Sequence, residues 1–256
     1  MIQLDALTRR FGDVVAVDSL DLEVAPGELV VLLGSSGCGK TTTLKMINRL
    51  IEPSAGVVRI DGAPTTELEP HELRRRVGYV FQQVGLFPHM TVAENVAVTP
   101  QLLGWEAGRI RRRVDELLEL VELDPAAVGD RRPAELSGGQ QQRIGVARAL
   151  AAGPKVMLLD EPFGALDPLT RDSLQQSLQR IRRQIGLTAV FVTHDMAEAL
   201  LLGDRIAAMR DGRLVQIGTP HELLAAPADD YVVELMQTPR RQVEAIERLL
   251  GGADDP

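Results

Sequence analysis

The stretch LVVLLGSSGCGKTT, residues Leu29–Thr42, decides the fold of this chain of 256 residues. It starts with five apolar residues without polar alternation, which is typical of a strand buried on both faces of a parallel sheet. Gly34–Thr41 then matches the pattern G-x-x-x-x-G-K-[ST], whose glycines permit left-handed backbone and let N–H groups converge on an anion. The helix expected next points its positive end at the same place. The sequence therefore predicts a phosphate-binding loop between a buried strand and a helix.

Two side chains of this loop have predicted roles in binding a nucleotide. Lys40 occupies the position that reaches the β- and γ-phosphates, and Thr41 the position whose hydroxyl ligates Mg²⁺. The chain has three lysines among its 28 basic residues, so the presence of one at this position indicates that a compact ammonium group is needed here. Cys38 is interpreted as a variable loop position and not as a nucleophile. The expected phosphate-contacting residues are Gly34, Ser35, Ser36, Gly37, Cys38, Gly39, Lys40, Thr41 and Thr42.

Composition excludes several classes of protein. With 45% hydrophobic and 25% charged residues, the chain suits one large α/β domain, or one domain with small lobes, and not a disordered protein. Its net charge of −8 gives no general attraction to nucleic acid or anionic lipid. The single cysteine excludes a disulfide framework within the chain and suits a reducing cytoplasm. The N-terminus lacks a signal-peptide core, and no apolar run approaches the roughly 20 residues of a spanning helix.

The periodicity of apolar residues changes along the chain. Residues 1–33 are expected to be β, and the alternation of apolar and polar residues over 15–24 predicts half-buried antiparallel strands. Leu44, Ile47 and Ile51 have the spacing of a helix after the loop. Thr91 and Glu94 fit a capping box, and residues 90–152 are expected to form a helical lobe inserted into an α/β core.

The α/β pattern then resumes. It comprises a strand at 155–160, a helix that ends at Gly186, a strand at 187–193, a tight hairpin at Asp211–Gly212 and a helical segment over 219–250.

The strand at 155–160 ends in two acids, Asp160 and Glu161. Ligands bind at the carboxyl ends of strands in open α/β sheets, so Asp160 suits a partner of Mg²⁺ and Glu161 a general base for the attacking water. Taken alone, the pair equally suits a helix cap and a solvated acid. Beside the phosphate loop, the catalytic interpretation is favoured.

A second glycine motif, Leu136–Gln140, opens a predicted helix. Ser137 is an ordinary N-cap residue. Two glycines in the first helical turn nevertheless cost about 1 kcal/mol each relative to alanine. A second phosphate approaching the bare backbone N–H groups would offset that cost.

This motif LSGGQ, the phosphate loop, the LLDE strand end and His194 after VFVT together resemble the ATP-binding subunit of ABC transporters over residues 2–236. The resemblance implies an α/β P-loop NTPase: a RecA-like core, an ABC antiparallel β lobe and an inserted α-helical signature lobe at about 90–152. Residues 237–256 are then expected to form a short C-terminal helix and polar tail, without the CBS pair of many relatives.

The resemblance also implies a homodimer, paired head to tail with two shared ATP sites. Its implied catalytic residues are Lys40, Gln82, Glu161 and His194, and its implied Mg²⁺ ligands are Thr41, Gln82 and Asp160. Phe11 would stack on adenine, while Ser137, Gly138, Gly139, Gln140 and Asp167 would contact the site across the dimer seam. Without the resemblance, Gln82 suits loop polarity, His194 a surface imidazole and Phe11 a core residue.

Three sequence segments, at 46–53, 85–91 and 164–172, resemble the quaternary-amine branch of this family, which imports glycine betaine, choline or carnitine. Membership would imply permease subunits, a substrate-binding protein, a peripheral location on the cytoplasmic face of the inner membrane and no nucleic-acid partner. Two alternatives stay open. One is the same role for a polyamine or amino acid importer, and the other is a soluble ABC ATPase of DNA repair or translation.

Overall fold

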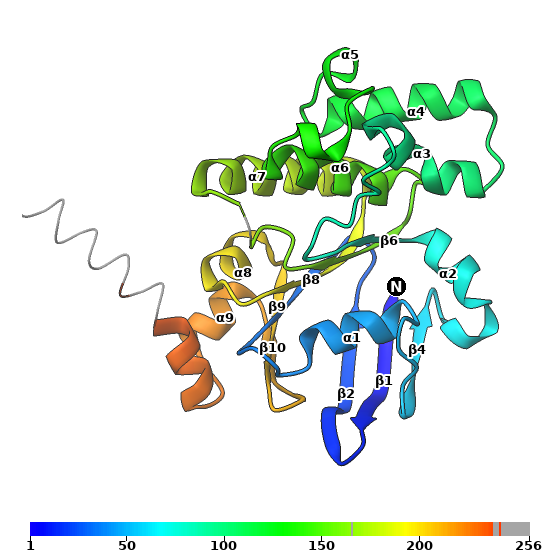
Figure 1. The fold of residues 1–256 in the computed structure, drawn as a ribbon. Helices are drawn as coiled ribbons and strands as arrows, with labels where there is room; N and C mark the ends of the chain where they lie inside the picture. Colours follow the sequence, from blue (N-terminus) through cyan, green and yellow to red (C-terminus); the bar gives the residue numbers. More distant parts are fainter. Residues whose placement is uncertain (165, 238–240, 242–256) are drawn as a thin grey trace, which may run out of the picture.

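The computed structural model describes residues 1–164, 166–237 and 241, and its strands form two sheets (Figure 1). One sheet is antiparallel, with the order β2-β1-β4-β5: β1 (Ile2–Phe11), β2 (Val14–Val24), β4 (Ala55–Ile60) and β5 (Ala63–Pro64). The other has the order β10-β9-β3-β8-β7-β6: β3 (Leu29–Leu33), β6 (Val77–Val80), β7 (Val156–Asp160), β8 (Thr188–Thr193), β9 (Arg205–Arg210) and β10 (Arg213–Gly218). Its strands run parallel except for the antiparallel pair β9–β10.

Helices lie on both sides of the six-stranded sheet (Figure 1). Above it in Figure 1 lie a group of helices from the middle of the chain and α7, while α1 lies below. No helix in the described part of the chain is long and apolar enough to cross a bilayer. The helices are α1 (Lys40–Ile47), α2 (Pro70–Arg76), α3 (Val92–Leu102), α4 (Ala107–Leu120), α5 (Pro125–Val128), α6 (Gly138–Leu150), α7 (Pro168–Ile185), α8 (Met196–Leu202) and α9 (Pro220–Ala225), with 3-10 turns at Thr65–Glu67 and Pro133–Glu135.

The central strands are apolar without alternation because both of their faces are covered. Every residue of β3, β7 and β8 is buried. Along β3, Leu29, Val31 and Leu33 pack into the core shared with the helices above the sheet. Val30 and Leu32 pack into the second core, which contains α1 and the antiparallel sheet. The parallel strands consequently end side by side at one edge of the sheet, where the predicted site residues follow them.

Several predicted boundaries agree with the structure. The capping box of Thr91 and Glu94 begins α3, and Gly186, at φ 63°, ends α7. Asp211 and Gly212, with φ 50° and 80°, form the turn between β9 and β10. Positive φ at both central residues is what a two-residue hairpin of this kind requires.

Two helical predictions were wrong in extent. Ile51 lies outside α1, because Arg49 is left-handed at φ 48° and the N–H groups of Leu50 and Ile51 both turn back to the carbonyl of Lys45. The segment 219–250 is not one helix: α9 ends at Ala225, ahead of Pro227, and residues 230–237 are helical again. The predicted tail, apart from residues 237 and 241, lies outside the described residues.

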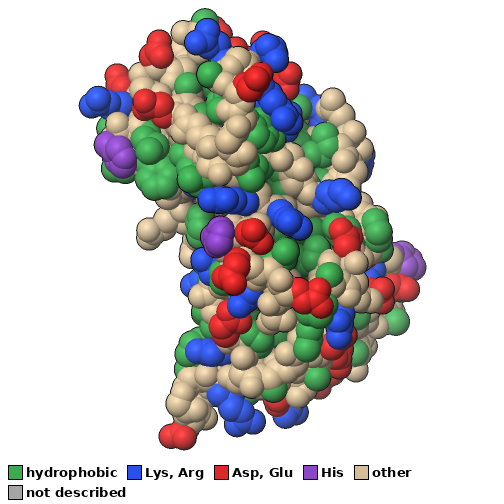
Figure 2. All heavy atoms as spheres, turned by 90° about the vertical axis from the view of Figure 1, so that its right-hand side faces the viewer, with side chains coloured by type: hydrophobic (Ala, Val, Ile, Leu, Met, Phe, Trp, Pro, Cys, Tyr) green, Lys and Arg blue, Asp and Glu red, His purple; other side chains and the backbone are tan. Residues whose placement is uncertain are grey.

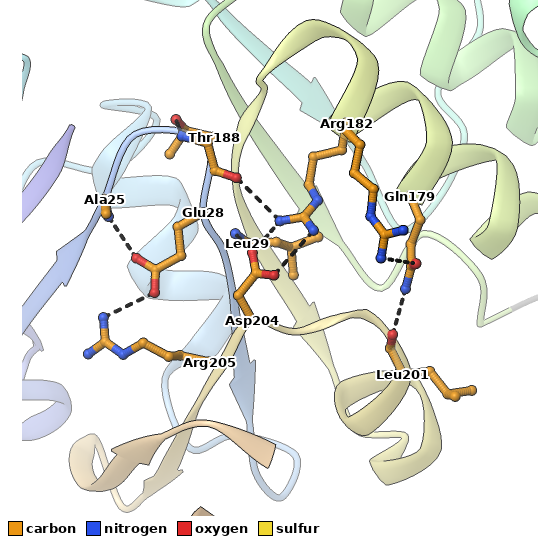
Figure 3. A network of polar contacts seen from close by, with 11 residues as sticks. Ala25, Glu28, Leu29, Gln179, Arg182, Thr188, Leu201, Asp204 and Arg205 are labelled. Carbon is orange, nitrogen blue, oxygen red and sulfur yellow. Dashed lines mark hydrogen bonds and ion pairs between the residues drawn. The ribbon is translucent and has the colours of Figure 1, made fainter. Parts of the chain in front are cut away.

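A polar network fixes the sheet at the edge opposite the predicted site (Figure 3). Asp204, which precedes β9, accepts the N–H of Leu29 at 2.8 Å and pairs with the buried Arg182 of α7. Arg182 also donates to the carbonyl of Gly27 at 3.3 Å. Glu28 pairs with Arg205 at 3.2 Å. The amino ends of β3 and β9 are thereby attached to α7.

A second network attaches the helical lobe to α7. Glu122, which follows α4, accepts hydrogen bonds from Arg143 of α6 at 2.9 Å and from Ser177 and Arg180 of α7, both at 3.0 Å. The hydrogen bond from Arg143, followed by those from the two α7 residues, lowers the pKa of Glu122 to about 2 against an opposing effect of burial. The group is therefore a carboxylate at neutral pH and holds three helical segments together.

Candidate functional site

The predicted phosphate loop joins β3 to α1, and close backbone contacts determine its shape. A Cβ atom on Gly34 would lie 2.2 Å from the carbonyl oxygen of Met209 in β9. A Cβ atom on Gly39, where φ is 103°, would lie 2.5 Å from the carbonyl oxygen of Ala16 in β2. Both glycines are therefore required by the fold itself, because no side chain fits at either position.

Lys40 lies inside this loop. Its ammonium donates to the carbonyls of Gly34 at 2.7 Å and Ser35 at 2.9 Å, and it is 3.7 Å from Cys38 Sγ. Lys40 and Cys38 are buried, whereas Ser35, Ser36 and Gly37 form an exposed rim. The lysine is thus held by neutral main-chain acceptors, which the charged oxygens of a phosphate can replace with stronger hydrogen bonds.

Thr41 meets the acidic end of β7. Its hydroxyl donates to Asp160 Oδ1 at 2.8 Å, and the hydroxyl of Tyr79 in β6 donates to the other oxygen at 3.4 Å. Burial raises the pKa of Asp160, and the hydrogen bonds from Thr41 and Tyr79 oppose that shift. Tyr79 is a site residue that the sequence analysis missed. Its signal was a hydroxyl within the otherwise apolar strand β6, which pairs with β7.

Three predicted catalytic residues meet at one carboxylate oxygen. Gln82 Nε2 donates to Glu161 Oε2 at 3.1 Å, and His194 Nδ1 lies 3.2 Å from the same atom. They follow β6, β7 and β8, which are neighbours in the sheet. Glu161 has a left-handed backbone, with φ 45°, at a cost of roughly 1–2 kcal/mol, while its N–H bonds to Val192. The structure thus aims a strained glutamate at this edge of the sheet.

The second glycine motif begins α6 with an intact capping box. Gln140 N donates to Ser137 Oγ at 3.3 Å, and Ser137 N donates to Gln140 Oε1 at 3.0 Å. A Cβ atom on Gly139 would lie 2.5 Å from Thr170 of α7, whereas one on Gly138 would meet nothing within 4 Å. Packing within the chain therefore explains Gly139 without a phosphate, and Gly138 leaves the helix terminus open.

The structure does not bring this motif to the phosphate loop of the same chain. In the described part of the chain, the hydrogen bonds of the Ser137 and Gln140 side chains join these two residues to each other. Asp167 caps α7 by accepting the N–H of Thr170 at 3.1 Å. Hydrogen bonds from the side chain of Thr170 and from its N–H lower the pKa of Asp167. Thr170 thus contacts both Asp167 and Gly139 of the motif Leu136–Gln140.

Phe11 lies at the end of β1, where 44% of its surface is exposed. The Arg9 guanidinium lies over its ring, 4.5 Å from the centroid. Phe11 pairs in register with Val14, two residues before the Ala16 carbonyl that approaches Gly39. An adenine ring stacking on Phe11 would use the face opposite Arg9 or displace the guanidinium.

The face shown in Figure 2 carries interspersed acidic and basic side chains, with Lys and Arg gathered at the waist between its upper and lower parts. Single-sign basic surfaces are the usual footprint of nucleic-acid binding. This face has the mixed charge of an ordinary solvated surface.

The chain is similar to known proteins over most of its length. The family described as ABC transporter matches residues 17–164. Two proteins of Bacillus subtilis, the glycine betaine/carnitine/choline transport ATP-binding protein OpuCA and the choline transport ATP-binding protein OpuBA, are 52% and 51% identical over 98% of this chain and 67% of their own lengths. The spermidine/putrescine import ATP-binding protein PotA of Acidothermus cellulolyticus is 49% identical over 96% of this chain and 65% of its own length.

Solved structures show the same fold. The ATP-binding cassette MJ0796, solved as a dimer in a post-hydrolysis state with ADP and Pi, has a TM-score of 0.77 and 35% identity. The alignment covers 86% of this chain and 99% of that one. The expected α/β P-loop fold is thereby confirmed. The chain spans about two thirds of the length of its curated relatives named above.

Proposed function

Because this chain belongs to the ABC transporter family and is an ATPase, we propose that it energises the import of a quaternary-amine osmoprotectant through separate permease subunits. Glycine betaine, choline and carnitine are the candidate solutes. The observation that carries the proposed chemistry is the meeting of Gln82, Glu161 and His194 at one oxygen, next to the Thr41–Asp160 pair. The solute class is supported by the names of the Bacillus subtilis relatives.

The phosphates of ATP would lie on the loop 34–42, with Lys40 exchanging its two carbonyl partners for phosphate oxygens. Mg²⁺ fits beside them, because the Thr41 hydroxyl and the Asp160 carboxylate supply adjacent oxygen donors of the kind it prefers. The ion would neutralise charge on the β- and γ-phosphates when bound. Gln82 lies beside the neighbouring Glu161 and would be a further ligand.

Glu161 would act as the general base. Gln82 and His194 both contact Oε2, so Oε1 is the oxygen left to accept a proton from water in this triad. A base held by two neighbours is oriented before the reaction, which is how positioning contributes to rate. Lys40 and His194 would stabilise the charge that develops on the γ-phosphate.

Two copies would complete the site by pairing head to tail. Ser137 and Gly138 are exposed at the open N-terminus of α6, where a phosphate held by another copy can approach the backbone N–H groups. Gly139 and Gln140 would support this contact, and Asp167 would lie along the seam. The dimeric state of the MJ0796 cassette supports this assembly.

The membrane partner would dock near the residues that follow β6. Phe81 and Phe87 are large apolar residues there, with exposed fractions of 42% and 40%. A permease helix seated on them would be coupled to Glu161 through Gln82. The ATP-binding domain would span residues 2–236, with its helical lobe at 90–152. The protein would be a peripheral subunit on the cytoplasmic face of the inner membrane. A substrate-binding protein would deliver the solute to the permease.

Polyamine import is the second candidate, because the spermidine/putrescine relative is almost as similar, at 49% identity. The ATPase site would be the same in either case. The phosphate loop would bind nucleotide and not the solute, so the solute must be identified in the assembled transporter.

Lys40→Ala is expected to weaken the affinity for ATP roughly 10- to 100-fold, the effect of removing a hydrogen bond to a charged group. Uptake of labelled glycine betaine by cells that depend on this protein is expected to stop. Both are compared with Lys155→Ala, since Lys155 is exposed at the opposite end of β7. Wild-type nucleotide affinity in the Lys40 variant would refute the phosphate-loop assignment.

A further inference from the structure

The side chain of Tyr231 reaches the phosphate loop from the helical segment 230–237. Its hydroxyl accepts the N–H of Ser35 at 3.3 Å and donates to the carbonyl of Met209 at 2.9 Å. In Figure 1 this orange-red segment lies near the turn that leads from the end of β3 into α1, where Tyr231 contacts Ser35. One hydroxyl therefore joins the loop, the end of β9 and the C-terminal part of the described chain.

The Met209 carbonyl that accepts from Tyr231 is also the group that excludes a side chain at Gly34. The Met209 carbonyl oxygen thus contacts both Gly34 and the Tyr231 hydroxyl, and a shift of the loop would disturb both contacts. Burial raises the pKa of Tyr231. The hydroxyl consequently keeps its proton at neutral pH and can donate to Met209 while it accepts from Ser35.

Tyr231 is itself held in place by its neighbours. The Arg210 guanidinium lies over its ring, 5.0 Å from the centroid, and pairs with Asp229 at 3.1 Å. Asp229 also accepts the N–H of Val232 at 3.0 Å. Because the ring is restrained, little conformational freedom remains to be lost when a nucleotide binds.

Two side chains of the described residues form hydrogen bonds with the Gly34–Ser35 backbone: Lys40 and Tyr231. Lys40 must leave both carbonyls to reach phosphate oxygens. Tyr231 bonds to the N–H of Ser35 and to the carbonyl of Met209, and so touches neither of the two carbonyls that Lys40 must leave.

We propose that Tyr231 is a positioning residue that keeps the phosphate loop in its binding conformation and so sets nucleotide affinity. It acts on the loop and touches none of the proposed reacting groups, so the rate of hydrolysis at saturating ATP does not depend on it. The inference rests on the nucleotide role proposed above for this loop.

Tyr231→Phe removes the hydroxyl and keeps the ring. The dissociation constants for ATP and ADP, measured by titration calorimetry, are expected to rise by the same factor, roughly two- to tenfold, as for the loss of one net hydrogen bond. The KM for ATP is expected to rise in parallel, with kcat within twofold of the wild type. A purely structural role would lower the melting temperature without this division between KM and kcat.

Gln216→Ala is the matched control. Gln216 of β10 accepts the N–H of Ala228 at 2.7 Å and donates to the carbonyl of Ala226 at 3.0 Å, so it anchors the residues that lead into the helical segment 230–237 and forms no hydrogen bond with the loop in the described part of the chain. We expect this variant to melt at a lower temperature with wild-type affinity. An equal loss of affinity in Gln216→Ala would overturn the role of the hydroxyl.

Failure of this inference is distinguishable from failure of the proposed site. Wild-type affinity in Tyr231→Phe, together with lost affinity in Lys40→Ala, overturns the role of Tyr231 alone. Wild-type affinity in Lys40→Ala overturns the loop assignment and this inference with it.

Discussion

Glu161→Gln is expected to slow ATP hydrolysis by roughly 10²- to 10⁴-fold, the range in which a general base contributes to rate. The amide cannot accept the proton of the attacking water. It retains the size of the carboxylate and one oxygen near Gln82 and His194, so the site should keep its shape. Nucleotide affinity is expected to stay within a fewfold of the wild type, and ATP should trap the protein as a dimer.

The measurement is steady-state phosphate release, accompanied by size-exclusion chromatography with and without ATP. Glu116→Gln is the control, because Glu116 is an exposed residue of α4 and the substitution removes the same charge. We expect wild-type turnover from the control. Wild-type hydrolysis by Glu161→Gln would refute the general-base role. Loss of hydrolysis in both Glu161→Gln and Glu116→Gln would show a general effect of the lost charge and would also contradict that role.

Ser137→Arg is expected to lower hydrolysis at least 100-fold, comparable with the loss of a principal group that stabilises transition-state charge. The arginine removes the Ser137 cap on Gln140 and fills the open space at the N-terminus of α6, where Gly138 presents bare backbone. A phosphate bound by another copy could then not approach. Because the loop 34–42 of the same chain is untouched, nucleotide affinity should be unchanged.

Hydrolysis and nucleotide affinity are measured on the same preparation. Ala134→Arg places the same side chain three residues earlier, at an exposed position outside α6, and is expected to leave turnover unchanged. Normal turnover in Ser137→Arg would contradict the shared site. Loss of affinity in that variant would show a disturbance of the fold, since the motif makes no hydrogen bond to the loop in the described part of the chain.

Local features of this fold could be predicted from the sequence because local chemistry determines them. The capping box at Thr91 follows from two side chains three residues apart in the sequence. The turn at Asp211–Gly212 follows from the Asp-Gly pair, whose residues adopt the positive φ that the turn requires. The meeting of Gln82, Glu161 and His194 was expected from the resemblance. Their order along the sheet edge depends on β6, β7 and β8 pairing as neighbours, which no local pattern determines.

Contacts between distant segments account for what the sequence analysis missed. The sequence analysis explained the glycine at position 139 by the approach of a phosphate. It missed that Thr170 of α7 occupies the position that a Cβ atom on Gly139 would need. Tyr231 is 196 residues from Ser35 along the chain, so neither residue marks the other in the sequence. Ile51 continued an apolar spacing that the left-handed Arg49 interrupts.

ATPase activity of the chain, co-purified with its permease in lipid and supplied with the binding protein, tests the central claim most directly. Glycine betaine, choline and spermidine would be added in turn, with the Glu161→Gln complex as the background. We predict that a quaternary amine stimulates phosphate release and that spermidine does not. Stimulation by spermidine alone, or steady hydrolysis without a response to any quaternary amine, would contradict the proposal that this ATPase energises osmoprotectant import.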